Sequence, residues 1–427
     1  MRQHEVNETT KSLVAYFTKR DVVLYALGIG CCCDNGNVDD AEESNRHDER
    51  ELKYAYERHT EFEVFPLYLL ALFFIAVKRR DDKTTNNTNN TTTPPSFGIR
   101  QFPPESMINR FDDWTSCGLL PKRCYRDPED AKQIQDLTIL HISQSLTLYD
   151  NISFVKMNDY NKNDGMLEVD DPPMQINLET RITCVKPRTI GTFVTSITTY
   201  HQSGKCIGTS TMVALILGLN PDKIIPFDEA PMSLTKKDDE RIIDRSRIND
   251  QGTSPINVGG KTRTVIRYQL PKNAALLYRL SGDYNPLHVT GNVQDETNKQ
   301  PVLHGLCTLG YSLRAVLRYV HGLPNRNERY EMKLSSLQCS FVKPVFVNDV
   351  LRIEMWDEEE KCLGEDGRHM LDVCFRVIRE RKNTGRHGEK QGDMALDKHQ
   401  YDLVLDKGRA QFQMKSGSNV AKVISRL

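Results

Sequence analysis

A short segment of the chain brings a carboxylate, an amide and an imidazole within six residues of one another. The segment reads S-G-D-Y-N-P-L-H and contains Asp283, Asn285 and His288. Its glycine, asparagine and proline are turn residues, which hold a backbone away from regular helix or strand geometry. A carboxylate and an imidazole are the usual pair for moving protons near neutral pH, so we predict that this turn aims Asp283 and His288 at one water molecule. Taken alone, such a motif is more often a surface turn with an incidental histidine.

A second segment, P-V-L-H-G, follows soon after and ends at Gly305. Behind it, apolar residues recur at steps of three and four, which is the period of one buried helix face; they are Leu306, Leu309, Leu313, Val316, Leu317 and Val320. A glycine at the start of this helix would present its backbone N–H at the positive end of the helix dipole, with no side chain to shield it. Such an N–H suits an oxygen that gains negative charge during a reaction.

Together, the two segments resemble the signature of the type 2, R-specific enoyl-CoA hydratases. That signature reads [YF]-x-x-S-G-D-x-N-P-[LIV]-H, then P-I-L-H-G-[LM]-C-T-x-G, and every polar residue of its first part is present here. The resemblance implies that Asp283 and His288 act on water and that Asn285 helps to hold it. It also implies that Gly305 supplies a backbone N–H to the thioester oxygen of the substrate.

The resemblance implies a hydro-lyase of peroxisomal fatty-acid beta-oxidation. The reaction would be reversible hydration of a trans-2-enoyl-CoA to the (3R)-3-hydroxyacyl-CoA, and the flanking Tyr284, His304 and Leu306 are expected to contact the substrate. Attack of water at C3 moves charge onto the thioester oxygen, which the Gly305 N–H would stabilise. This chemistry needs no metal or redox cofactor, and the sequence carries no motif for either. The expected partners are the substrate, a second copy in a homodimer and a peroxisomal import receptor.

Two departures from the family pattern keep other functions open. After His288 the chain reads V-T-G-N-V-Q-D-E-T-N-K-Q, where the family is more apolar, and the family's P-V-x-P-G becomes P-V-F-V-N, ending at Asn348. The first rival is another activity of the same fold, acyl-CoA thioester hydrolysis or acyl-carrier dehydration. The second is an acyl-CoA-binding protein that has lost its activity.

The bulk composition excludes several classes of protein. The chain has 427 residues and a net charge of −1, without a basic stripe, so no nucleic-acid partner is expected. Its longest apolar run, residues 65–77, is shorter than the ~20 residues that span a bilayer, and it predicts a buried helix rather than a membrane span. The eleven cysteines show no zinc-ligand spacing and predict free thiols in a reducing compartment.

Periodicity divides the chain into two similar halves. Each half shows a helix, at 62–77 and 303–320, followed by alternating strands, which is the pattern of a hot-dog fold; the strands are expected at 137–149, 174–185, 191–201, 205–218, 262–269, 334–342, 347–355 and 370–379. Two such halves resemble the double hot-dog of the eukaryotic family members, an α+β fold in which each antiparallel sheet wraps around a long helix.

The expected domain boundaries follow from this division. An N-terminal half covers 1–218, with polar insertions near 79–96 and 158–173, and a proline-rich and charged linker covers 219–258. The catalytic half covers 259–387, and a flexible tail covers 388–427. The chain ends in Ser425-Arg426-Leu427, a variant of the S-K-L peroxisomal address.

The N-terminal half contains nothing like the motif around Asp283. By resemblance it is the half that lost its active site and makes room for the acyl tail, with the helix at 65–77 as one wall. The family carries L-H-G-x-Q in this half, where the chain has L-H-I-S-Q from 140 to 144. We expect His141, in this segment, to be a structural histidine.

Overall fold

The computed structural model describes most of both halves of the chain. The described residues are 10–33, 49–78, 120, 124–127, 138–154, 174–229, 263–291, 300–322, 330–357, 361–363, 368–382 and 399–416. The polar insertions expected at 79–96 and 158–173 lie outside these residues, as do most of the linker and the C-terminal tripeptide.

Both halves consist of antiparallel strands that alternate buried and partly exposed side chains, the pattern of a sheet with one face on a core. In the N-terminal half the strands are β1 (Thr10–Phe17), β2 (Val77–Lys78), β3 (Thr138–Leu148), β4 (Met174–Arg188), β5 (Gly191–Gln202), β6 (Lys205–Leu217) and β7 (Phe227–Asp228). In the C-terminal half they are β8 (Thr264–Gln269), β9 (Tyr330–Phe341), β10 (Val350–Asp357), β11 (Lys361–Leu363), β12 (Arg368–Lys382) and β13 (His399–Ser416).

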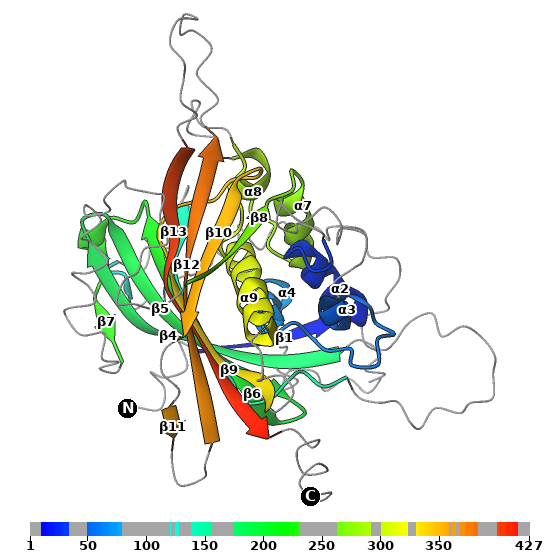
Figure 1. Cartoon of the computed structure of the whole chain (residues 1–427). Coiled ribbons are helices and arrows are strands. Elements are labelled where there is room, and N and C mark those ends of the chain that lie inside the picture. The colour runs from blue at the N-terminus through cyan, green and yellow to red at the C-terminus, as the bar shows by residue number, and fades with distance from the viewer. Residues whose placement is uncertain are drawn as a thin grey trace, which may run out of the picture.

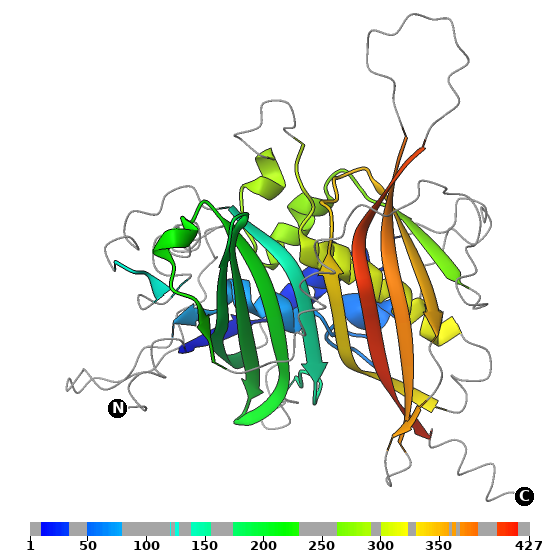
Figure 2. The ribbon, with the colours of Figure 1, turned by 90° about the vertical axis from the view of Figure 1, so that its left-hand side faces the viewer.

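The two halves share one continuous sheet. Its order is β2-β1-β4-β5-β6-β3-β9-β13-β12-β10-β8, with β7 beside β4 and β11 beside β12. The halves join where β3 pairs with β9, for example Gln144 opposite Cys339. Figure 1 shows the sheet curving around the helices, and Figure 2 shows the strands of the two halves side by side with the helices behind them.

One long helix, α9 (Gly305–Gly322), lies against the sheet of the C-terminal half (Figure 1). Its apolar side chains at steps of three and four are buried, as the sequence predicts. The corresponding helix of the N-terminal half, α4 (Tyr68–Ile75), has only eight residues, so the helix expected over 62–77 is much shorter than predicted. Each half is thus an antiparallel sheet around a helix, and the double hot-dog expected from the sequence is confirmed.

Shorter helices connect these layers to the segment that carries Asp283. They are α2 (Lys19–Gly28), α3 (Glu49–Ala55), α7 (Ala274–Tyr278), η6 (Arg279–Ser281) and α8 (Leu287–Thr290), with the short turn η5 (Pro221–Lys223) before β7. A capping box starts α2, because the Asp21 carboxylate accepts the Thr18 N–H at 2.7 Å. The α2 helix packs against α7 and η6, and α4 also packs against η6. Helices of the N-terminal half therefore pack against the segment of the C-terminal half that carries the candidate site.

Two strands correct the sequence-based boundaries. The tail expected to be flexible from 388 onward contains β13, which lies between β9 and β12 in the middle of the sheet. Its apolar alternation is interrupted near Lys407, whose φ is +53°, and this break hides the strand from a simple pattern search. The other strand, β1, precedes α2 and pairs with β4; it was not predicted. The remaining expected strands are confirmed, with small shifts at their ends.

Two expectations from composition can be compared with the described residues. The nine cysteines whose side chains the structure describes form no disulfide with one another. Among the helices described, none combines the length and the apolar character needed to cross a bilayer.

Candidate active site

The turn that carries Asp283 begins where the short helices α7 and η6 end. The chain reverses at Gly282, whose φ of +115° lies in the left-handed region that favours glycine. A Cβ atom at this position would lie 2.4 Å from Cγ2 of Ile75, at the end of α4. Glycine is therefore required twice, for the backbone conformation and for the close approach of the N-terminal half.

Side chains within the motif fix the path of the turn. The backbone N–H of Asn285 donates to Oδ1 of Asp283 at 3.3 Å, and the N–H of Leu287 donates to Oδ1 of Asn285 at 3.0 Å. Both are local bonds of the Asx type, which shape a loop without help from distant residues. The asparagine oxygen thus shapes the turn that leads into α8.

His288 lies in α8 and is buried. Its Nδ1 lies 2.7 Å from the carbonyl oxygen of Val302, the residue two positions before His304. A carbonyl can only accept, so Nδ1 carries the proton and donates it, and Nε2 is the basic nitrogen of the neutral ring. The imidazole is thus oriented and prepared to accept a proton through Nε2.

His304 packs directly on His288. The two rings are stacked, with centroids 3.6 Å apart and planes 24° apart, and Nε2 of His304 donates to the backbone carbonyl oxygen of Asp283 at 3.1 Å. Burial, and to a lesser degree the charge of His288, hold the pKa of His304 well below its usual range. His304 is therefore a neutral ring that ties the Asp283 turn to the start of α9.

The Asp283 carboxylate is half-buried beside these two rings. Burial raises the pKa of Asp283, and the nearby His288 and the Asn285 N–H oppose this rise only in part. One side-chain ligand atom from each of Asp283, His288 and His304 lies within 4.8 Å of the others. A carboxyl group with a raised pKa beside an oriented imidazole is suited to exchanging protons with a bound reactant.

This group of three side chains is less suited to a metal ion. The lone pairs of an imidazole lie in the plane of its ring, and two stacked rings direct them along nearly parallel planes. One nitrogen of each ring already donates to a backbone carbonyl. The two histidines would have to move apart before their nitrogens converged on one ion.

Gly305 is the first residue of α9, so the N–H groups of the first turn have no partner inside the helix. An added Cβ would lie 3.3 Å from Cε1 of Phe341, a residue of β9. Any larger residue at this position would press on that ring. The glycine therefore allows close packing and leaves its N–H uncovered by a side chain.

The structure places the other predicted residues around this group. Leu306 is buried in the first turn of α9, and Tyr284 lies half-buried with the Arg279 guanidinium 4.8 Å from its ring. Substrate contact by Tyr284, His304 and Leu306 stays a prediction. The Val302 carbonyl and the Phe341 ring were not predicted, because neither carries a motif.

His141 has the structural role expected from the sequence. Its Nε2 lies 3.0 Å from Oε1 of Gln144, and its ring packs 4.5 Å from that of Phe341. Burial lowers the pKa of His141 to about 4, so this imidazole is neutral near pH 7. It supports the ring that covers Gly305.

One comparison with known proteins falls on the part of the chain that carries Asp283, His288 and Gly305. The MaoC-like domain family matches residues 254–371. Peroxisomal multifunctional enzyme type 2 of Mus musculus is 40% identical over 95 residues, which cover 22% of this chain and 12% of that protein. Enoyl-CoA hydratase 2, peroxisomal, of Arabidopsis thaliana is 38% identical over 97 residues, which cover 22% of this chain and 29% of the relative.

Among solved structures, a MaoC-like dehydratase from Phytophthora capsici aligns with a TM-score of 0.49 and 18% identity, covering 95% of this chain and 96% of that one. The curated relatives are matched over less than a third of their own length. The family match nevertheless contains Asp283, His288 and Gly305, which all lie inside residues 254–371. The part of the chain that holds the candidate site therefore resembles the MaoC-like domain family and the type 2 enoyl-CoA hydratases.

Proposed function

We propose that the protein is a hydro-lyase that adds water reversibly to trans-2-enoyl thioesters. The observation that carries the proposal is the grouping of the Asp283 carboxylate with the His288 and His304 imidazoles, whose ligand atoms lie within 4.8 Å of one another. The bond from His288 to Val302 selects the tautomer that a general base requires. The relative from Arabidopsis thaliana, which is named as an enoyl-CoA hydratase, supports the same chemistry.

In the proposed reaction, the water oxygen forms a bond to C3 of the substrate. Nε2 of His288 accepts the proton that the water loses, and the Asp283 carboxyl gives a proton to C2. Transfer of the proton from His288 back to Asp283 then restores both groups. Asn285, whose side-chain oxygen accepts the Leu287 N–H, offers its NH₂ group to hold the water.

The thioester oxygen becomes negative while C2 awaits its proton. The N–H of Gly305 at the start of α9 is the donor assigned to this oxygen, and the N-terminal end of the helix adds a favourable field. Loss of one such donor typically raises a barrier by about 2.7–4 kcal/mol. This donor and the two proton-transfer groups together account for the reaction without a cofactor.

The finer assignments also belong to the proposal. They are CoA as the thiol of the substrate, an R product, a role in peroxisomal fatty-acid beta-oxidation, a homodimer and recognition by a peroxisomal import receptor. The name of the Arabidopsis thaliana relative supports CoA as the thiol, and the names of both relatives support a peroxisomal location. Light scattering of the purified chain tests the dimer, and a fluorescent fusion imaged beside a peroxisomal marker tests the location.

Incubation with crotonyl-CoA tests the central proposal. Hydration removes the enoyl absorbance and yields a 3-hydroxyacyl-CoA whose configuration chiral chromatography identifies as R. Release of free thiol at the same rate would instead indicate a thioesterase. Binding of the substrate without any turnover would indicate an acyl-CoA-binding protein that has lost its activity.

The roles of the two proton-transfer groups are tested by Asp283→Ala and His288→Ala. Each substitution is expected to abolish hydration while the circular dichroism spectrum and the thermal transition persist. Full activity in either folded variant would remove that residue from the mechanism.

A further inference from the structure

A loop between β9 and β10, residues 344–349, lies behind the site and has a closed internal structure. Oδ2 of Asp349 accepts the N–H of Phe346 at 2.8 Å, and the N–H of Asp349 donates to the carbonyl of Phe346 at 3.2 Å. Asn348 adopts a φ of +68°, a left-handed conformation that asparagine tolerates well. The carboxylate of Asp349 thus holds both ends of a tight turn.

This loop supports the segment that orients His288. The N–H of Leu303 donates to the carbonyl of Val345 at 2.7 Å, and Val302 and Phe346 form an isolated β-bridge. The carbonyl of Val302 is the acceptor for Nδ1 of His288. The residues after Leu303 are His304 and Gly305, so the loop fixes the backbone that serves both halves of the proposed mechanism.

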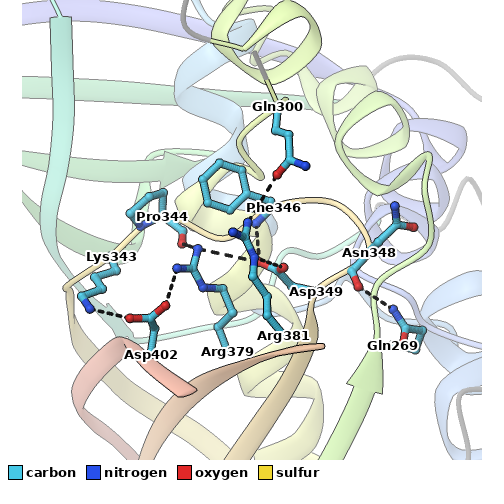
Figure 3. Close-up of polar contacts among 10 residues, drawn as sticks. All are labelled: Gln269, Gln300, Lys343, Pro344, Phe346, Asn348, Asp349, Arg379, Arg381 and Asp402. Atoms are coloured by element: carbon cyan, nitrogen blue, oxygen red, sulfur yellow. Dashed lines mark hydrogen bonds and ion pairs between the residues drawn. The ribbon is translucent and has the colours of Figure 1, made fainter. Parts of the chain in front are cut away.

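Two arginines of β12 hold the loop in turn (Figure 3). Nε of Arg381 donates to Oδ1 of Asp349 at 2.9 Å, and the Arg379 guanidinium donates to the carbonyl of Pro344 at 2.8 Å. Both guanidiniums lie over the ring of Phe346, 4.4 Å away for Arg381 and 5.2 Å for Arg379. Arg379 is further tied to the carboxylate of Asp402, which also accepts from Lys343.

The burial of these groups indicates precise positioning and not added stability. Asp349 is only 4% exposed, and a buried ion pair is weak evidence for stability, because desolvation offsets most of its Coulombic energy. These contacts form a series in which Arg381 binds Asp349, Asp349 holds the 344–349 loop, and the loop pairs with Val302. Each contact limits the orientation of the next group. A displacement of the Val302 carbonyl would rotate the His288 ring, and small errors of alignment at a reacting centre are costly.

We propose that Asp349 and Arg381 are positioning residues for the hydration reaction, acting through the 344–349 loop and the Val302 carbonyl on the His288 imidazole. Neither is assigned contact with the substrate. This inference rests on the proposed function. It gives residues 344–348, where the chain reads P-V-F-V-N in place of the family's P-V-x-P-G, an indirect effect on catalysis.

A matched pair of variants on one strand tests the proposal. Arg376 also lies on β12, and its side-chain exposure is 27% compared with 33% for Arg381. It binds a buried carboxylate too, because its Nε donates to Glu354 at 2.8 Å. Side chains alternate along the strand, so Arg376 projects from the opposite face, where it contacts Glu354 and not the loop. Arg376→Met therefore reproduces the loss of an ion pair without disturbing the loop.

We expect Arg381→Met to lower kcat with crotonyl-CoA by about 10- to 100-fold, with KM changed far less, because misplacement of a catalytic group acts on the chemical step. Asp349→Asn should have a similar effect, and the double variant should be no worse than the poorer single one, because both residues act through one contact. Arg376→Met should keep wild-type kcat, and Arg381→Lys should recover part of the loss.

A second measurement does not depend on turnover. In ¹⁵N-detected NMR of the whole chain, His288 of the wild type should show the Nδ1–H tautomer, and Arg381→Met should shift its population towards Nε2–H. If the wild type shows no hydration, the proposed function fails while this measurement still tests the positioning. The positioning proposal is overturned if Arg381→Met and Arg376→Met lose activity equally, or if the His288 tautomer is the same in both variants.

Discussion

The two stacked histidines are the same type of residue in two different hydrogen-bonding roles. His288 donates through Nδ1 to Val302 and keeps Nε2 for chemistry, whereas His304 donates through Nε2 to the Asp283 carbonyl. Burial keeps His304 neutral, and a neutral ring can lie against His288 without the repulsion that two charged rings would cause. Asp283, between these contacts, is held partly out of water, which is useful for proton transfer and costly for stability.

Because burial of the Asp283 carboxylate lowers stability, the free energy of unfolding should depend on pH in a defined way. Burial raises the pKa of Asp283 above 3.8 in the folded chain, so its contribution to stability is full below pH 3.8 and is lost as the pH rises through the raised value. Asp283→Asn removes the charged form and should therefore unfold at a higher urea concentration than the wild type at pH 7, although its hydration activity is lost. At pH 3 the two transitions should coincide. A variant that is less stable at pH 7 would contradict this account of the carboxylate.

A substitution at Gly305 tests two properties of this position together, its close packing against Phe341 and the exposure of its backbone N–H. Gly305→Ala places a methyl group about 3.3 Å from the Phe341 ring and beside the N–H assigned to the thioester oxygen. We expect kcat to fall by about 10- to 1,000-fold, as when an oxyanion donor is displaced. Gly322→Ala is the matched control, because it lies at the other end of α9 and its added Cβ would meet no atom within 4 Å. Steady-state kinetics of both variants measure the difference, and equal kcat values would exclude Gly305 from the reaction.

At the scale of the elements, β13 is the main correction to the sequence-based view. A strand in the middle of a sheet should be essential to the fold, unlike a flexible tail. Phe412, which is fully buried in β13, should cost about 3–5 kcal/mol of unfolding free energy when replaced by alanine. Gln411→Ala, a less buried position of the same strand, should cost much less. Urea denaturation of the two variants makes the comparison, and a negligible cost at Phe412 would argue that β13 does not form.

Sequence and structure agree best where local chemistry decides the outcome. The turn around Asp283 and Asn285 follows from residues that bond within the same turn, and α9 follows from its apolar period. The hairpin between β5 and β6 turns at Ser203 and Gly204, both with positive φ, as turn residues predict.

The features that could not be predicted depend on contacts between distant segments. The Val302 carbonyl has no side-chain signature, and its role exists only because α8 and the 344–349 loop converge on it. The start of α4 has a local cause, because Pro66 disfavours helix in the residues before it. The end of α4 depends on a distant segment, because the chain after Ile75 continues into β2, which pairs with β1. The spacing of apolar residues shows which face of a helix is buried, but it does not show at which residue the helix ends.

At the scale of the whole molecule, an ion pair links the halves beneath the shared sheet. Nε of Arg314, on α9, donates to Glu51, on α3, at 2.6 Å, and Arg318 approaches the same carboxylate at 2.9 Å. The Arg314 side chain is only 1% exposed. Its guanidinium also lies 4.7 Å from the ring of Tyr268, so one cation contacts elements of both halves.

Removal of one partner of this pair should be more harmful than removal of both. Glu51→Gln leaves the Arg314 charge buried without its counter-ion and is expected to cost about 3–5 kcal/mol of unfolding free energy. The double variant Glu51→Leu with Arg314→Leu should recover much of that loss, because it removes the two most buried charges and leaves only Arg318, whose side chain is 25% exposed. Thermal unfolding of the single and double variants provides the measurement. A double variant that is less stable than Glu51→Gln would show that the ion pair stabilises the fold by more than the neutralisation of two buried charges.

The sheet that unites the two halves also limits how copies of this chain can meet. Within the described residues it ends on one side at β2, a strand of two residues, and on the other at β8, a strand of six that carries the exposed Arg267. Short and charged borders are poor templates for a neighbouring backbone, and proteins use them to avoid edge-to-edge aggregation. The strands of the two halves are joined inside one polypeptide, where β3 pairs with β9. Within the described residues, the two borders therefore offer few backbone groups through which a second copy could extend the sheet.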